Sequence, residues 1–283
     1  MASALYKMGK RILILFIFSA LFALGWASDR NLQVFKAENT DGNPTPVVVV
    51  CPGGSYSWLD IETEGIGVAR WLQSNGITAV VLPYRVQGVP SFLFHYRWIV
   101  RGTQYPDALN DLQDAICYVR RNAGDLNIDP KKLGAMGFSA GGHLVASSVM
   151  MCDVDSLMPN FVAPIYPVVT MQKGDITHKR SRRALLGEYR KHSDMWRDSL
   201  SLEKHVRKDL PPLFLVNCKD DPIVDYRNSE LLDSALTANR VPHEYHQYNT
   251  GGHGFGADPK KASEECIQWR DEFLRWLSDI GMK

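Results

Sequence analysis

The chain has 283 residues, of which 45% are hydrophobic and 22% are charged, so it is long enough for one sizeable α/β domain. A formal net charge of +1, without a Lys/Arg-rich stripe interleaved with aromatic residues, argues against a nucleic-acid partner. The one basic cluster, HKRSRR at 178–183, is best interpreted as the start of a solvated helix leading into ALLGEYR.

The N-terminal segment has the parts of a secretory signal peptide. Basic residues precede the apolar run ILILFIFSALFAL, and small residues follow it: Lys7, Lys10 and Arg11, then Gly25 and Ala27. We therefore expect residues 1–27 to be a signal peptide and residues 28–283 to form the mature domain of a secreted or periplasmic protein. An uncleaved anchor is the alternative, but the run is shorter than the roughly 20 residues that a membrane span needs. After cleavage we expect no stable membrane insertion.

Short apolar segments that resemble buried strands alternate with helical patterns along the rest of the chain. The expected strands are 46–51, 77–84, 133–138, 161–169, 212–218 and 242–248. The expected helices are 62–75, 106–123, 140–151, 225–239 and 261–279. This alternation predicts a single α/β domain with a mostly parallel, doubly wound sheet flanked by helices.

Two connections are longer than this pattern requires. Residues 88–105 are dense in aromatic side chains, and residues 170–210 are polar and charged. Long connections often form functional loops or lids, and the alternative is an insertion packed onto the body of the domain. Both interpretations stand for the first connection, whereas packing is preferred for the second.

The cysteines and histidines give no metal pattern. Five cysteines are scattered without a CxxC pair: Cys51, Cys117, Cys152, Cys218 and Cys266. An odd number leaves at least one thiol unpaired in a monomer, and although one bridge is compatible with export, their apolar surroundings favour small buried side chains. The histidines form no HExxH motif, so we expect neither a metal nor another cofactor.

Ser139 is the candidate nucleophile. It lies in the G-x-S-x-G sequence of residues 137–141, between a strand-like and a helix-like segment, which is the context of a nucleophile elbow. A serine hydroxyl needs a base, and His253 in the glycine-rich segment 249–256 follows the last strand, in the order Ser…Asp…His. His143, four residues after the serine, is better placed to pack near the turn.

An orienting carboxylate is expected after the strand 212–218. Asp221 is the preferred residue because Pro222 rigidifies the turn that follows it, and Asp220 remains the alternative. Asp225 is interpreted as a helix cap. Backbone N–H donors for an oxyanion are expected at Ala140 and in the loop CPGGSY, at Gly53 or Gly54.

With these residues in place, the sequence resembles the α/β-hydrolase superfamily, and more closely the small secreted acetylxylan esterases and xylanase-associated carbohydrate esterases. The resemblance covers about residues 45–279 and includes the stretches PGGSY, VLPYRV, YPDALNDLQDAICYVR, LNIDPKKLGAMGFSAGGHL, IYPVVTM, SLEKHV, DDPIV and GGHGFG. It implies the α/β-hydrolase fold, no metal, and the same three residues as nucleophile, carboxylate and base. The family commonly has a third glycine where this chain has Ser55, which is tolerable if Ser55 has ordinary dihedral angles.

The resemblance therefore implies an esterase whose substrate partner is an acetylated oligo- or polysaccharide, cleaved through an acyl-enzyme on Ser139. Tyr56, Trp58 and Trp98 are candidates for a sugar-binding rim, with packing as the alternative for each. Two other activities remain open: a serine peptidase of the prolyl-oligopeptidase type, and a feruloyl or other short-chain carboxylesterase. A non-catalytic sugar-binding protein is the third alternative, and the filled catalytic positions argue against it.

Overall fold

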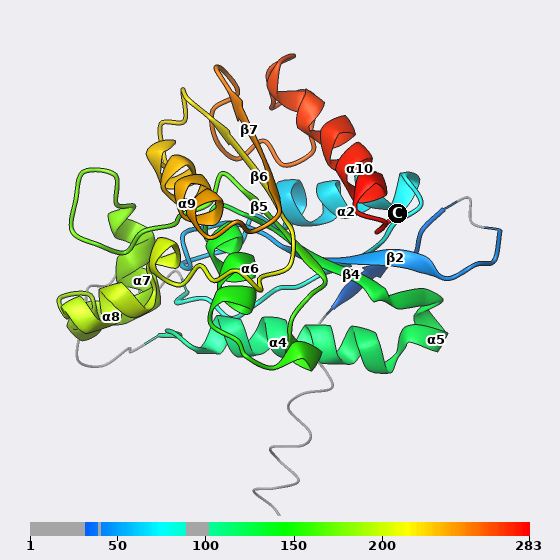
Figure 1. Ribbon diagram of the computed structural model, residues 1–283, viewed down its shortest axis with the longest axis horizontal. Coiled ribbons are helices and arrows are strands. Elements are labelled where there is room, and N and C mark those ends of the chain that lie inside the picture. The colour runs from blue at the N-terminus through cyan, green and yellow to red at the C-terminus, as the bar shows by residue number, and fades with distance from the viewer. Residues whose placement is uncertain (1–31, 39–40, 89–101) are drawn as a thin grey trace, which may run out of the picture. The chain divides into compact units, whose positions relative to one another are not determined.

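A seven-stranded sheet in the order β1-β3-β2-β4-β5-β6-β7 organises the computed structural model, which describes residues 32–38, 41–88 and 102–283 (Figure 1). Within these residues β1 is antiparallel to β3, and every other pair of neighbouring strands is parallel. Residues 33–283 make up one compact unit. The expected signal peptide, residues 1–27, and its boundary lie outside the described residues.

The strands follow the apolar segments of the sequence. They are β1 (Gln33–Phe35), β2 (Thr45–Cys51), β3 (Thr78–Val81), β4 (Ile128–Phe138), β5 (Phe161–Ile165), β6 (Leu213–Cys218) and β7 (His243–Tyr248). The side chains of Val47 to Cys51 in β2 are fully buried, as expected for a β-branched strand of a parallel sheet covered on both faces.

The helical segments lie between the strands. They are η1 (Ile61–Gly67), α2 (Val68–Ser74), α4 (Asp107–Arg121), α5 (Ala123–Leu126), α6 (Ala140–Met150), η2 (Asp155–Leu157), α7 (Lys179–Arg190), α8 (Asp194–Ser199), η3 (Leu202–Lys204), α9 (Arg227–Ala238), η4 (Cys266–Gln268) and α10 (Trp269–Asp279). The helix α4 shows why they form: its buried residues recur at helical spacing, and arginines occupy its last turn. The basic cluster at 178–183 begins α7, as predicted.

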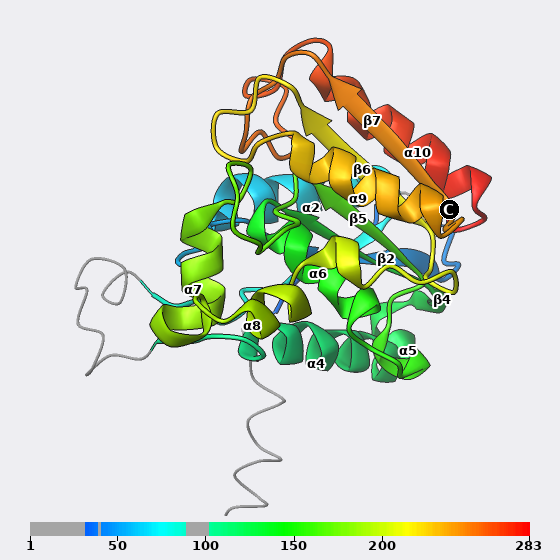
Figure 2. The same ribbon diagram turned by 60° about the vertical axis from the view of Figure 1, so that its left-hand side comes forward.

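Helices cover both faces of the sheet. Helices α2 and α10 lie on one face, and α4, α6 and α9 lie on the other (Figures 1 and 2). The first face carries an aromatic core in which Trp269, Phe273 and Trp276 of α10 pack against the strands and against Trp71 of α2. None of the helices in the described ranges is long and apolar enough to span a bilayer.

The predicted α/β-hydrolase architecture is confirmed, and several details differ. The strand expected over 133–138 begins at Ile128, and the strand expected over 77–84 is Thr78–Val81. The strand expected over 161–169 ends at Ile165, because Tyr166 has a φ of 37°. The helix expected from residue 261 begins with η4 and α10, after a series of turns. The helix expected over 62–75 starts as the π-helical η1. The edge strand β1 was not predicted, because three residues are too few for a periodic pattern.

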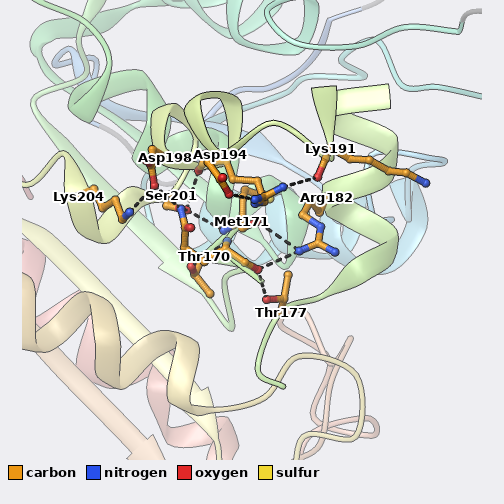
Figure 3. A network of polar contacts seen from close by, with 11 residues as sticks. Thr170, Met171, Thr177, Arg182, Lys191, Asp194, Asp198, Ser201 and Lys204 are labelled. Atoms are coloured by element: carbon orange, nitrogen blue, oxygen red, sulfur yellow. Dashed lines mark hydrogen bonds and ion pairs between the residues drawn. The ribbon is translucent and has the colours of Figure 1, made fainter. Parts of the chain in front are cut away.

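The connection 170–210 is an insertion packed onto the body, as preferred from the sequence: the Leu200 carbonyl oxygen lies 2.9 Å from His143 Nε2 of α6, and Asn228 of α9 donates to the Ile176 carbonyl at 2.8 Å. Figure 3 shows the polar contacts within the insertion. Arg182 and the Thr177 hydroxyl both donate to the Gln172 carbonyl, at 2.9 and 2.5 Å. Arg197 is 1% exposed, forms an ion pair with Asp194 and donates to a backbone carbonyl. These internal contacts give the segment a fixed shape. Of the aromatic connection 88–105, only residues 102–105 and Gly88 lie within the described residues.

The five cysteines are free thiols. Cys218, at the end of β6, and Cys266, at the start of η4, are buried with their Sγ atoms 3.4 Å apart. The other three are buried or partly buried, as the apolar sequence context predicts.

The carboxyl end of β2 is the point where the chain order of the sheet reverses, since β3 lies on one side of β2 and β4 on the other. In open α/β sheets, ligands bind in the crevice at such a point. The loops after β2 and β4 meet there, and they are the loops that carry CPGGSY and Ser139.

Candidate active site

Ser139 occupies the sharp turn between β4 and α6 with φ 55° and ψ −114°, a conformation that residues with a side chain rarely adopt. A Cβ atom on Gly137 would lie 2.1 Å from the Gly141 carbonyl oxygen. A Cβ atom on Gly141 would lie 2.1 Å from the Cys51 carbonyl oxygen. Only glycine fits at these two positions, so the turn has the geometry that the G-x-S-x-G pattern predicts.

Backbone hydrogen bonds hold this turn in place. The Ser139 N–H donates to the Ile165 carbonyl oxygen at 3.0 Å, and the Ser139 carbonyl oxygen accepts from Val168 and His143, each at 3.2 Å. The residue is 4% exposed and stands at the N-terminus of α6, where the helix dipole is positive. The surroundings therefore fix the serine in its strained conformation, next to the end of the helix that favours negative charge.

Asp221 and His253 form a hydrogen-bonded pair. Asp221 Oδ2 lies 2.6 Å from His253 Nδ1, and the Asp221 side chain is 1% exposed. The other carboxylate oxygen of Asp221 accepts from the N–H groups of Ile223 and Val224, at 2.8 and 3.0 Å, which fixes its orientation. Because a carboxylate only accepts, Nδ1 carries the imidazole proton, and Nε2 is left with a lone pair.

Asp220 has a different role from Asp221. Its carboxylate accepts from the N–H groups of Gly251 and Gly252, at 3.2 and 2.8 Å, so it shapes the turn before the histidine. Asp225 accepts from the N–H of Arg227 at 3.0 Å, but the N-cap of α9 is Tyr226, so Asp225 stands one residue before the cap position that the sequence assigned to it. Of the three candidate aspartates, only Asp221 contacts His253 in this structure.

Tyr166 joins the serine turn to the histidine loop. It follows Ile165, the residue that holds the Ser139 N–H, and its ring centroid lies 4.5 Å from that of His253. No direct hydrogen bond links the Ser139 hydroxyl to His253 among the described residues. In uncomplexed enzymes such hydrogen bonds are often long, and they tighten when a substrate binds.

The loop after β2 differs from the prediction in one respect. The Gly53 N–H, a predicted oxyanion donor, donates instead to Glu64 Oε2 at 2.6 Å. Gly54, with a φ of 134°, and Ala140, the first residue of α6, are the other two predicted donors. Ser55 has a φ of 58°, a left-handed conformation that glycine adopts more readily, so its dihedral angles are not ordinary.

The predicted sugar-binding aromatic residues have three different outcomes. Tyr56 is 3% exposed, and its hydroxyl lies 2.8 Å from His143 Nδ1, so it is a core residue and the rim prediction is wrong for it. Trp58 is 37% exposed, with the Arg180 guanidinium 5.5 Å from its ring centroid. Trp98 lies outside the described residues.

His143 packs near the turn, as the sequence suggested. Its Nε2 lies 2.9 Å from the Leu200 carbonyl oxygen, which can only accept, so Nε2 carries the proton and Nδ1 accepts from the Tyr56 hydroxyl. Complete burial lowers the pKa of His143 to about 4, although the hydrogen bond to Leu200 opposes the shift. His143 is therefore a neutral connector between the loop after β2, helix α6 and the insertion 170–210.

A hollow of about 300 Å³ opens beside Asp221. Pro222, Ile223 and Tyr226 line it from the loop after β6, and Ile176, Thr177 and His178 line it from the insertion. Burial, followed by the nearby His253 and Arg180, lowers the pKa of His178 to about 4. Ile223, one of its lining residues, also donates its N–H to Asp221.

Glu64 and Tyr166 are site residues that sequence reasoning missed. Glu64 is 3% exposed and Tyr166 is 1% exposed, and the two side chains share a hydrogen bond of 2.8 Å. A glutamate in the polar stretch DIETEG is expected on the surface, because glutamates are rarely fully buried without a partner. The position of Glu64, 13 residues after Cys51, carries no motif that could have revealed its role.

The chain matches one known protein family and is similar in sequence to proteins from two bacteria. The profile of the family named BD-FAE matches residues 32–236. The chain is 33% identical over 232 residues to endo-1,4-beta-xylanase B of Butyrivibrio fibrisolvens, covering 78% of this chain and 34% of that protein. It is 30% identical over 267 residues to an acetylxylan esterase of Xylanibacter ruminicola, covering 92% of this chain and 50% of that protein. The chain thus spans a third to a half of the length of these two relatives.

Among solved structures, the acetyl ester-xyloside bifunctional hydrolase of Caldicellulosiruptor lactoaceticus has a TM-score of 0.75 at 31% sequence identity. The match covers 89% of this chain and 88% of that one.

Proposed function

The chain belongs to the BD-FAE family, and on that premise we propose that it is a serine esterase acting on carbohydrate esters, above all the O-acetyl groups of xylan and hemicellulose fragments. The observation that carries the proposal is the strained turn of Ser139, joined through Tyr166 to the Asp221–His253 pair. The acetylxylan esterase and the acetyl ester-xyloside hydrolase to which the chain is similar support this substrate class.

In the proposed reaction, Ser139 Oγ attacks the ester carbonyl carbon while His253 Nε2 takes the hydroxyl proton. Asp221 keeps the imidazole in the required tautomer and stabilises the imidazolium ion. The N–H groups of Gly54 and Ala140 donate to the oxyanion of the tetrahedral intermediate. The carbon–oxygen bond to the sugar then breaks, and His253 returns the proton to the sugar oxygen.

Water completes the cycle. His253 Nε2 removes a proton from a water molecule, which attacks the acyl carbon and forms a second tetrahedral intermediate. That intermediate releases the carboxylic acid and restores the Ser139 hydroxyl. We also propose that the protein is exported, with residues 1–27 as its signal peptide.

The decisive experiment measures acetate release by the mature chain from acetylated xylan, acetylated xylo-oligosaccharides and p-nitrophenyl acetate. Replacing the nucleophile in Ser139→Ala should lower kcat by about 10⁴-fold or more on every ester, because no other group supplies the attacking oxygen. Ser148→Ala is the matched control, since Ser148 is a buried serine of the same helix that donates to the Val145 carbonyl.

A loss of less than tenfold in Ser139→Ala would refute the assignment of the nucleophile. Turnover of the aryl ester without release from either glycan would retain the serine mechanism and remove the carbohydrate substrate. Faster hydrolysis of feruloyl esters or aminoacyl-nitroanilides would identify a feruloyl esterase or a peptidase instead.

A further inference from the structure

Glu64 is a buried carboxyl group in an unusual helix. It lies in η1, a π-helical segment whose first turn is held by Asp60, since Asp60 Oδ1 accepts from the Thr63 N–H at 3.1 Å. π-Helical turns often occur at functional sites, where they redirect a side chain. Here the side chain of Glu64 points away from solvent, while Glu62 on the same segment is exposed.

One carboxylate oxygen of Glu64 holds the loop after β2. Oε2 accepts from the Gly53 N–H at 2.6 Å, and the next peptide carries Gly54, one of the two proposed oxyanion donors. A Cβ atom placed on Gly53 would lie 2.5 Å from this oxygen and 3.0 Å from Ser139 Cβ. The carboxyl group and the proposed nucleophile therefore both lie next to the same side of Gly53.

The other carboxylate oxygen holds the histidine loop through Tyr166. Oε1 accepts from the Tyr166 hydroxyl at 2.8 Å, and that hydroxyl accepts from the Gly256 N–H at 3.2 Å. The Tyr166 ring packs against the rings of His253 and Phe255, with centroids 4.5 and 4.6 Å apart. Tyr166 has a φ of 37°, a strained conformation that these contacts maintain. One carboxyl group thus fixes two separate parts of the proposed active site.

Burial is the largest influence on Glu64 and raises its pKa, while the hydrogen bonds from Tyr166 and Gly53 and the nearby His253 lower it. The titratable groups that face it are Asp60 on its own segment, Tyr84 after β3, Tyr166 after β5 and His253 on the histidine loop, with Asp221 behind His253. Both of its oxygens accept hydrogen bonds, as an ionised carboxylate does. A negative charge here favours the imidazolium form of His253, the form produced when Ser139 gives up its proton.

We propose that Glu64 is a positioning residue of the esterase reaction, which fixes the loop carrying Gly54 and, through Tyr166, the loop carrying His253. This inference rests on the proposed function. Glu64 itself touches none of the reacting atoms, and it acts through the backbone of one loop and the ring that supports the other.

The test compares three variants with the wild-type chain in p-nitrophenyl acetate hydrolysis from pH 5 to pH 9. Glu64→Gln keeps the shape of the side chain but leaves one of its two donors without an acceptor. We expect kcat to fall about 10- to 100-fold with KM within about threefold, because small displacements of catalytic groups cost this much. The acidic limb of the kcat/KM profile should also move to lower pH, because a negative charge near His253 is lost.

Tyr166→Phe tests the positioning of the His253 loop separately from the charge of Glu64. It keeps the aromatic ring and the Glu64 carboxylate but removes the hydroxyl between them, so we expect a smaller fall in kcat, about tenfold, and an acidic limb that moves less than in Glu64→Gln. Glu62→Gln is the matched control on the same segment and should retain wild-type kinetics. If Glu64→Gln does not fold, the Tyr166→Phe result decides the question.

Wild-type kcat and an unmoved pH profile in folded Glu64→Gln would overturn the inference. A loss that follows only the fraction of folded protein, measured by circular dichroism, would overturn it as well, because it would indicate a purely structural role. If the wild-type chain hydrolyses no ester in a Ser139-dependent manner, the proposed function is refuted, and the inference about Glu64 is refuted with it.

Discussion

The loop that carries His253 and the loop that carries Gly54 both follow the carboxyl ends of parallel strands, β7 and β2, yet they are held in different ways. On the histidine side, the supporting groups belong to the motifs themselves: Asp221 binds His253, and Asp220 binds the two glycines just before it. On the oxyanion side, the supporting groups come from outside the motif. Glu64 binds Gly53, and His143, which lies 87 positions away, binds Tyr56.

This difference explains which predictions succeeded. A motif whose residues hold one another can be interpreted from sequence, because the spacing of polar and glycine residues reflects their contacts. A glycine loop held by a buried carboxylate outside any motif shows only its glycines in the sequence. The comparison also implies that the histidine side depends on a few strong polar contacts, whereas the oxyanion side depends on the packing of the surrounding domain.

For this comparison, the largest expected change in kcat concerns the histidine side, at Asp221 and Asp220. Asp221→Asn should lower kcat by about 10³- to 10⁴-fold, because an amide nitrogen facing Nδ1 favours the wrong imidazole tautomer. Asp220→Asn should lower it by less than about tenfold, since its carboxamide oxygen still accepts from one of the two glycine N–H groups and Asp220 does not contact His253. The measurement is kcat on p-nitrophenyl acetate. Equal losses in the two variants would contradict the assignment of Asp221 as the orienting carboxylate.

An intermediate effect is expected on the oxyanion side. In Gly54→Ala, the added methyl group would lie 2.1 Å from the Trp58 carbonyl oxygen, and the φ of 134° disfavours a side chain, so the loop must move. We expect kcat to fall about 10²- to 10³-fold, the usual cost of losing one oxyanion donor.

Gly124→Ala is the control for this substitution, because nothing lies within 4 Å of an added Cβ and the residue is helical. Its activity should match wild type. If Gly54→Ala kept full activity, the oxyanion donor would have to be sought elsewhere in the loop.

The last prediction concerns the free energy of unfolding and not the rate. It tests how far the oxyanion side depends on the buried, neutral His143. The pKa of His143 is about 4 in the folded chain, against 6.5 for an exposed histidine. Between these values the unfolded chain binds more protons, so the free energy of unfolding falls as the pH decreases, by about 3 kcal/mol at pH 4.

Urea unfolding at pH 7 and pH 4 measures this change. His178, whose pKa is also lowered to about 4, contributes in the same direction, so the comparison needs a His143→Gln variant. That variant should lose less stability between the two pH values than the wild-type chain does. Identical pH dependence in both proteins would contradict the neutral, buried state of His143.

The sequence was sufficient to predict the fold and the residues that form local motifs. The apolar runs predicted six of the strands, and the pairing of Asp221 with His253 in the structure agrees with the expected order and spacing. The contacts of residues that belong to no motif could not be predicted. The burial of Tyr56 requires His143, and the burial of Glu64 requires Gly53 and Tyr166, so neither environment is visible from neighbouring residues.

The backbone conformation of Ser139 lowers the stability of the fold at the position that the proposed activity requires. Its φ of 55° costs roughly 1–3 kcal/mol relative to a relaxed residue, and glycine would relieve most of that cost. Glycine would also remove the hydroxyl group that we assign to catalysis. Selection for stability and selection for turnover therefore favour different residues at this position. The single substitution Ser139→Gly should give a more stable but inactive chain.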